Sequence, residues 1–317
     1  MTINKLLLSV TTLFILSYGT SYAQSVLYGA AGESCGDAPN INASLYIVDP
    51  QTAETTFIGP IGFDGVSGMA VLGDGRVVAS ANADLPQLKI AVLIEINPFT
   101  GQGTLIGQIG DETNPGECGR VPDLTYDPAT DTLYGAGKKC RDGGASVDET
   151  RLLEINPNTA QATIIGNTGE DLAGTGLAMS PGGTLYLAGN SGNSLPIVNG
   201  QLFTINPDNA QITSNTPLIP MTFASPNGMD FDPDTGVLFT SDSNAPNTPR
   251  WGLETIDTQS GVLTLIGPLP DCFDALVFFQ SKPRPIPTLS MWGIIAAAAV
   301  LGFAALVVIR RRRLAVN

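Results

Sequence analysis

The chain has 317 residues, of which 29 are acidic, 15 are basic and none is histidine, and its net charge is −14. The absence of histidine excludes histidine-based catalytic triads, histidine metal ligands and histidine proton shuttles. All 29 acidic residues and eight of the basic ones lie between Glu33 and Asp274, so this region carries a charge of −21. Such a surface repels the phosphate backbone, and we do not expect a nucleic-acid partner.

Residues 1–23 have the organisation of a secretory signal peptide. Lys5 precedes a short apolar run, and Ser21-Tyr-Ala23 places small residues three and one before a cut ahead of Gln24. The apolar core of about ten residues is too short to span a bilayer comfortably. We therefore expect export and cleavage after Ala23, with a retained membrane anchor as the alternative.

One segment recurs five times between residues 45 and 267. Each copy is an alternating strand that runs into a turn centred on Asn or Asp, and a second short strand follows. In such turns the Asn or Asp side chain caps the chain, and Gly is expected to take a positive φ. The turn residues recur at intervals of 48 to 59 positions, at Asp49, Asn97, Asn156, Asn206 and Asp257. A period near 50 with β character predicts the blades of a propeller.

A second pair of strands lies between successive hairpins, so each period holds four strands, the content of one propeller blade. The two ends of the region complement each other. It begins with a lone strand at residues 26–31 and ends with a lone strand at 275–279, and with the first hairpin these would form a fifth blade without an open edge. We predict an all-β ectodomain over residues 24–281, a five-bladed β-propeller whose N- and C-terminal strands share a blade. An open β-solenoid is the alternative.

Four cysteines fit an oxidising compartment, where they are expected to pair. Cys118 and Cys140 flank the first two strands of one predicted blade, and Cys272 and Cys35 flank the corresponding strands of the closing blade. We therefore predict the disulfides Cys118–Cys140 and Cys35–Cys272, the second of which would join the two ends of the ring. The spacing does not match a pair of CxxC zinc knuckles.

A propeller usually binds its ligand at one mouth of the central channel. The residues that begin the predicted innermost strands are Ser67, Asp123, Thr175, Asn227 and Asp274. Asp123, Asn227 and Asp274 offer the oxygen ligands that a hard cation such as Ca²⁺ prefers, and we name them candidate metal ligands. The alternative is that these side chains cap turns or accept main-chain N–H groups.

The segment Pro226-Asn-Gly-Met-Asp-Phe-Asp-Pro, within residues 226–243, resembles the metal-binding blade of gluconolactonase-like calcium propellers. The resemblance implies that Asn227 and Asp274 ligate calcium and that Asp274 acts as the base of a lactonase-type hydrolase. Two features depart from that family. No glutamate near Ser67 corresponds to its first-blade ligand, and its enzymes mostly have six blades.

A proline-rich linker occupies residues 282–290, and the uncharged apolar stretch 291–309 follows it. Its length is close to the ~20 residues that a membrane-spanning helix needs. Arg310, Arg311, Arg312 and Arg313 come next and are expected to hold the basic tail, residues 310–317, in the cytoplasm. We therefore predict one C-terminal transmembrane helix, with the propeller on the outer side of the inner membrane.

The residues around the start of this stretch read Ile286-Pro-Thr-Leu-Ser-Met-Trp-Gly293. With the helix and the arginines, they resemble the IPTL-CTERM family of bacterial protein-sorting tails. Met291 departs from the Glu that is usual there, and the matching residues are Ile286, Pro287, Thr288, Leu289, Ser290, Trp292 and Gly293. The resemblance implies cleavage by an exosortase-type protease, which would remove the helix and send the protein to the cell surface or the matrix. A permanent single-pass anchor is the alternative.

Catalytic motifs are scarce. No glycine-rich loop precedes a predicted helix, and no serine has a histidine or a Ser-x-x-Lys lysine to activate it. We therefore expect a non-enzymatic binding or scaffold module that presents acidic loops to a surface protein or a glycan. The alternative is a calcium-dependent lactonase-type hydrolase with its site at the channel mouth, and calcium is the only cofactor that the sequence suggests.

Overall fold

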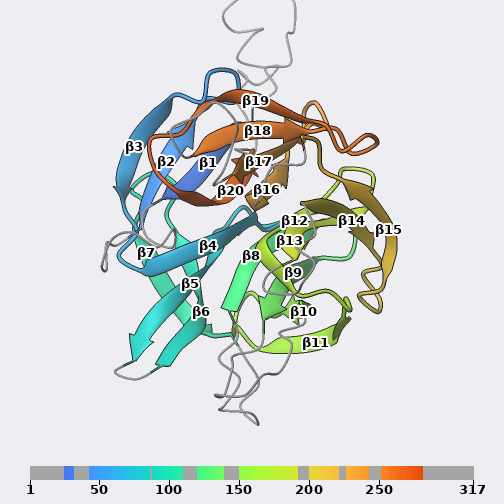
Figure 1. Cartoon of the computed structure of the whole chain (residues 1–317). Helices are drawn as coiled ribbons and strands as arrows, with labels where there is room; N and C mark the ends of the chain where they lie inside the picture. Colours follow the sequence, from blue (N-terminus) through green and yellow to red (C-terminus); the bar gives the residue numbers. More distant parts are fainter. Residues whose placement is uncertain are drawn as a thin grey trace, which may run out of the picture. The chain divides into compact units, whose positions relative to one another are not determined.

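The computed structural model describes residues 25–31, 43–85, 88–109, 120–138, 150–191, 200–220, 226–242 and 251–280. Within these ranges every regular element is a strand, and the 20 strands form five four-stranded antiparallel sheets (Figure 1). The predicted five-bladed propeller is therefore confirmed. The part of the chain that is described contains no helix long and apolar enough to span a membrane. The predicted signal peptide, sorting motif, transmembrane helix and basic tail lie outside it.

All strands belong to the compact unit Gln24–Gln280, in which each blade runs from an innermost to an outermost strand. Blade 1 holds, in that order, β4 (Asp64–Val71), β5 (Val77–Leu85), β6 (Leu88–Ile96) and β7 (Gly103–Gln108). Blade 2 holds β8 (Arg120–Asp127), β9 (Thr132–Lys138), β10 (Arg151–Ile155) and β11 (Ala162–Asn167). Blade 3 holds β12 (Leu172–Met179), β13 (Leu185–Ser191), β14 (Gln201–Ile205) and β15 (Ile212–Pro217). Blade 4 holds β16 (Pro226–Phe231), β17 (Leu238–Asp242), β18 (Gly252–Ile256) and β19 (Leu263–Pro268). Blade 5 holds β20 (Phe273–Phe279), β1 (Val26–Ala31), β2 (Ser44–Val48) and β3 (Thr55–Pro60).

Blade 5 combines the two ends of the unit. Its innermost strand, β20, pairs antiparallel with β1 from Val26 opposite Phe279 to Ala31 opposite Phe273. The five innermost strands β4, β8, β12, β16 and β20 lie around one central axis (Figure 1). Pairing of the last strand with the first removes the free edges that an open array of sheets would expose.

Neighbouring blades meet through a repeated contact. The turn between the third and fourth strands of each blade packs against the outermost strand of the blade before it. The last position of the turn is glycine in the repeat pattern, and glycine was expected to take the positive φ there. In three of the five turns an alanine takes the positive φ instead: Ala53, Ala160 and Ala210. A Cβ added at the facing residues Gly267, Gly107 and Gly166 would lie only 3.1–3.2 Å from these alanine Cβ atoms. Each of the three contacts thus pairs one alanine with one glycine, and the Ala53–Gly267 contact joins blades 5 and 4.

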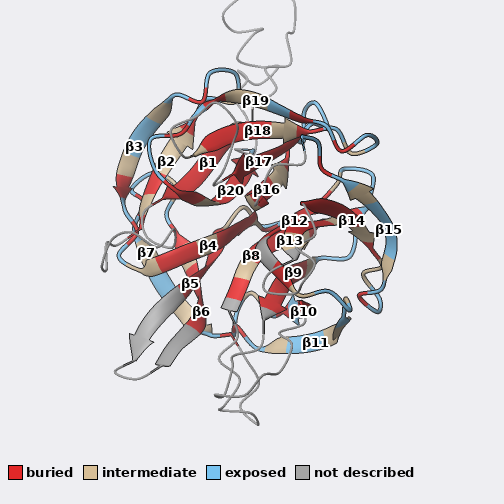
Figure 2. Cartoon of the chain, in the orientation of Figure 1, coloured by how far each residue is buried: buried red, intermediate tan, exposed pale blue. Residues whose placement is uncertain are grey.

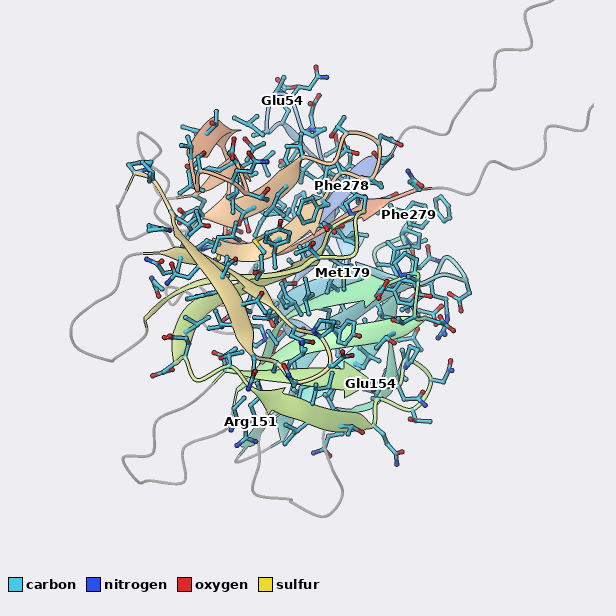
Figure 3. The ribbon with its side chains drawn as sticks, turned by 90° about the vertical axis from the view of Figure 1, so that its right-hand side faces the viewer. Glu54, Arg151, Glu154, Met179, Phe278 and Phe279 are labelled. Atoms are coloured by element: carbon cyan, nitrogen blue, oxygen red, sulfur yellow. The ribbon has the colours of Figure 1, made fainter. Side chains whose placement is uncertain are left out.

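The hydrophobic core consists of five clusters of buried side chains, each lying between two adjacent blades. Inner strands such as β4 and β16 are mainly buried, whereas β11 and β15 on the outside expose long stretches (Figure 2). Phe278 and Phe279, at the end of β20, belong to different clusters (Figure 3). The ring of Phe278 lies 5.2 Å from that of Phe239, and the ring of Phe279 lies 5.8 Å from that of Tyr28. Because successive residues of a strand face opposite sides, β20 contributes side chains to the cluster between blades 4 and 5 and to the cluster between blades 5 and 1.

Cys272 lies directly before β20 and is disulfide-bonded. The other three cysteines, Cys35, Cys118 and Cys140, lie outside the described residues. The pairing predicted from the sequence therefore stays a prediction.

Candidate functional site in the central channel

The innermost strands approach each other closely around Asp123, which is the fourth residue of β8. A Cβ added at Gly68 would lie 2.5 Å from the Cα of Asp123, and one added at Gly228 would lie 2.4 Å from the nitrogen of Leu276. A Cβ at Gly176 would lie 2.8 Å from the carbonyl oxygen of Asn227. Because real Cβ atoms do not tolerate such distances to backbone atoms, glycine is required at these three positions. The channel is consequently narrow at the level of the predicted site.

Asp123 is fully buried at the centre of this region, and its carboxyl group accepts three main-chain hydrogen bonds. Its Oδ1 accepts a hydrogen bond from the nitrogen of Leu124 at 2.9 Å. Its Oδ2 accepts one from the nitrogen of Leu177 on β12 at 2.8 Å and one from the nitrogen of Met229 on β16 at 3.2 Å. An innermost strand has no further strand to pair with, so its N–H groups need other acceptors. Asp123 supplies them and thereby links blades 2, 3 and 4.

Two further side chains, Thr125 and Asp230, also accept a main-chain N–H group from the innermost strand of the next blade. Thr125 Oγ1 accepts a hydrogen bond from the nitrogen of Met179 at 2.9 Å. Asp230 Oδ2 accepts one from the nitrogen of Phe278 at 2.7 Å, and its Oδ1 accepts one from Phe231 at 2.8 Å. Neither residue is among the five that the sequence indicated for the channel mouth. The available signal was that Asp230 is the one acidic residue at its position in the five inner strands, the others being Ala70, Tyr126, Ala178 and Val277.

Burial dominates the electrostatics of the channel. It raises the pKa of Asp123 well above its ordinary value, and the nearby carboxyl group of Asp230 raises this pKa further, although the three main-chain N–H groups oppose both effects. Burial likewise raises the pKa of Asp230 to about 7. The channel thus contains two carboxyl groups that hold a proton more tightly than exposed carboxyl groups do.

The remaining predicted residues make different contacts. Asn227 and Asp274 are half-buried, and Asp274 Oδ1 lies 3.1 Å from Cys272 Sγ. Ser67 Oγ donates a hydrogen bond to the carbonyl oxygen of Val121 at 3.1 Å, whereas the buried Thr175 Oγ1 has no hydrogen-bond partner among the described residues. Across the same residues no group of three or more Asp, Glu, His or Cys side chains is arranged to hold a metal ion. Three of the roughly four acceptor directions of the Asp123 carboxyl group are used by main-chain N–H groups.

The acidic turn after β16 holds the ends of the propeller unit. Asp234 Oδ2 accepts hydrogen bonds from the nitrogen of Ser25 at 3.0 Å and from its hydroxyl at 2.8 Å. Asp234 Oδ1 accepts one from Gln280 Nε2 at 3.0 Å, and Asp232 Oδ1 accepts one from the Ser25 hydroxyl at 2.9 Å. These contacts join the acidic turn to both ends of the propeller unit.

A shallow cleft lies where blade 4 meets blade 5. Its volume is about 600 Å³, and its lining includes Thr52, Glu54, Trp251, Pro268, Leu269 and Pro270. Glu54 is exposed on the turn after β2 and lies at the outer end of the molecule in Figure 3. The cleft combines apolar side chains with the exposed carboxylate of Glu54.

No family model matches the chain, and no curated protein matches it. Among solved structures it is similar to a chain of a nidogen/laminin complex, with 10% identity over 82% of this chain and 99% of that one and a TM-score of 0.49. A candidate 6-phosphogluconolactonase from Bacteroides fragilis NCTC 9343 has 12% identity over 80% of this chain and 98% of its own, with a TM-score of 0.43. An engineered GH43 glycoside hydrolase has 13% identity over 63% of this chain and a TM-score of 0.44, and this chain spans only 39% of its length. Similarity at this level carries no information about the chemistry of the present chain.

Proposed function

We propose that this protein is exported, sorted to the cell surface or matrix through its tail, and acts there by binding rather than by catalysis. Two sequence features support the sorting part: the signal-peptide pattern of residues 1–23 and the resemblance of residues 286–317 to an exosortase-processed tail. The proposal places the cleavage near the Ile-Pro-Thr-Leu motif, after insertion of residues 291–309 in the inner membrane.

One observation carries the non-enzymatic part. The carboxylate of Asp123, the most deeply placed of the three candidate ligands, is bonded to three main-chain N–H groups. A lactonase-type site would need this mouth to bind a metal with free oxygen ligands and to leave Asp274 as a base. Within the described residues Asp123, Thr125 and Asp230 instead accept main-chain N–H groups of the inner strands.

The cleft between blades 4 and 5 supports a binding role at the rim. Trp251 is partly exposed there beside Pro268 and Pro270. Aromatic side chains with polar neighbours are typical of surfaces that bind sugars or peptides. The partner in this proposal is a surface glycan or a surface protein, and the following experiment separates the two.

The test combines binding and turnover on the full chain in detergent. The wild type is applied to immobilised glycans and to surface proteins of the host, beside Trp251→Ala and Phe99→Ala. Phe99 is 75% exposed on the turn after β6 and serves as a matched control away from the cleft. We expect binding that Trp251→Ala weakens and Phe99→Ala leaves unchanged. Turnover of a lactone or ester that requires calcium and is lost in Asp274→Asn would contradict the proposal and establish the hydrolase.

A further inference from the structure

Glu254 interrupts the apolar pattern of the repeat. It stands three positions before the turn residue Asp257, where the other four copies have a large apolar side chain: Tyr46, Ile94, Leu153 and Phe203. Each of those four packs in the cluster between its own blade and the blade before it. Glu254 therefore occupies a core position between blades 3 and 4, and it is only 1% exposed.

Two more polar side chains share this face. Thr240 on β17 lies directly opposite Glu254, and Asp242 lies opposite Gly252, one diagonal step away on the same face. They are 0% and 2% exposed. The positions that correspond to Asp242 in the other blades hold only small residues: Ala31, Ala81, Gly137 and Gly189. Blade 4 therefore differs from the other blades at two neighbouring positions: Asp242 replaces a small residue, and Glu254 replaces a large apolar one.

No group among the described residues satisfies Glu254. Both of its carboxyl oxygens are buried without a hydrogen-bond partner there. Burial, and next the nearby carboxyl group of Asp242, raise its pKa to about 7. A buried carboxylate without a partner is strongly unfavourable, whereas a bound cation would neutralise both buried carboxylates together.

We propose that Glu254, Asp242 and Thr240 form a binding site for a hard divalent cation of the calcium type between blades 3 and 4. The two carboxylates can supply up to four oxygen ligands and the Thr240 hydroxyl a fifth, so main-chain carbonyls or water would complete the six to eight that Ca²⁺ takes. The site differs from the predicted channel mouth, because it lies on the second and third strands of blade 4. It stands independently of the binding function proposed above.

The experiment uses the full chain in detergent, with Trp292→Phe in every sample so that Trp251 is the one remaining tryptophan. Trp251 directly precedes Gly252, the residue paired with Asp242, and is therefore close enough to sensitise Tb³⁺ held at the site. We expect sensitised Tb³⁺ emission that Ca²⁺ displaces, and a melting temperature that Ca²⁺ raises relative to chelator.

Glu254→Leu is the central variant, because Leu is the residue that blade 2 carries at this position and is expected to pack without a cation. It should weaken Ca²⁺ binding by at least about 100-fold, since it removes one of two charged ligands. Glu154→Gln removes the same single negative charge at an exposed position of blade 2 (Figure 3) and should leave binding unchanged. Absence of Ca²⁺ binding to the wild type, or equal binding by Glu254→Leu, would overturn the proposal. Loss of binding in Asp274→Asn alone would also overturn it, because the ion would then lie at the channel mouth.

Discussion

The carboxylate of Asp123 on β8 accepts a hydrogen bond from the main-chain nitrogen of Met229 on β16, 106 positions later in the chain and two blades away. The same oxygen accepts one from Leu177 on the blade between them. A single side chain thus connects three blades across the axis. Such contacts replace the strand pairing that innermost strands lack, and they explain why a narrow five-bladed ring contains buried acids.

Removal of the Asp123 side chain is expected to destabilise the propeller. Asp123→Ala leaves the N–H groups of Leu177 and Met229 buried without acceptors, which costs about 2–5 kcal/mol of unfolding free energy in total. Urea unfolding of the variant beside wild type measures the effect. Glu154→Ala on the surface is the control and should change stability by less than about 0.5 kcal/mol. Equal stability of Asp123→Ala and wild type would show that these hydrogen bonds contribute nothing.

The buried acids should make stability depend on pH. The pKa values of Glu254 and Asp230 are about 7 in the folded chain, above their ordinary values of 4.5 and 3.8. Between about pH 4 and 7 the folded chain therefore holds protons that the unfolded chain has released. The contribution of these two groups to stability is fully present below about pH 4 and is lost as pH rises through about 7. With chelator present, Glu254→Gln should be more stable than wild type at pH 8, by up to about 3 kcal/mol, and equal to it near pH 4. A constant difference at all pH values would contradict this assignment.

Close approach of the inner strands predicts a contrast between two glycines. Gly228→Ala would place a Cβ 2.4 Å from the nitrogen of Leu276, so the backbone of β20 would have to move. We expect a loss of about 3 kcal/mol or more in chemical unfolding. Gly182→Ala, whose Cβ would meet only Ser180 Oγ at 3.8 Å, should be tolerated. Similar losses for the two variants would mean that the inner ring is wider than the structure shows.

The disulfide pairing is a further prediction. Peptide mapping under non-reducing conditions should recover Cys35 linked to Cys272 and Cys118 linked to Cys140. Because the first bond would close a loop over most of the chain, its removal in a Cys35→Ala, Cys272→Ala variant should lower the unfolding free energy by about 5.5 kcal/mol in the chain-entropy model. Recovery of Cys272 linked to Cys118 or Cys140 would refute the pairing.

Much of the fold could be predicted because the repeat is strong. Side chains such as Asn97 and Asn156 mark each hairpin turn, and their Oδ1 atoms accept main-chain N–H groups in the structure as expected. The expectation that glycine takes the positive φ in the hairpin turns holds for only some of the turns. Ala53, Ala160 and Ala210 take a positive φ in three of the five turns, and each faces a glycine of the neighbouring blade, a contact that is not visible in the local turn sequence.

The candidate site was harder to predict. Position in the repeat assigned Asp123 to an inner strand, where it is the fourth residue of β8 rather than the first. Which N–H groups its oxygens accept depends on how blades 3 and 4 close around the axis. Comparison of the copies at the position of Glu254 could have found that residue, because it alone is charged there. A search for short motifs did not find it, because Glu254 lies on β18 and its neighbour Asp242 lies on β17, twelve positions earlier.

The central claim is that the tail is a sorting signal that is removed when the protein reaches the surface. Its most direct test is the intact mass of the protein isolated from the surface fraction of the native host. We predict a chain that begins at Gln24 and ends before Trp292, without the apolar stretch and the arginines. A mass that still includes Trp292 to Asn317 would contradict the claim and leave a permanently anchored propeller.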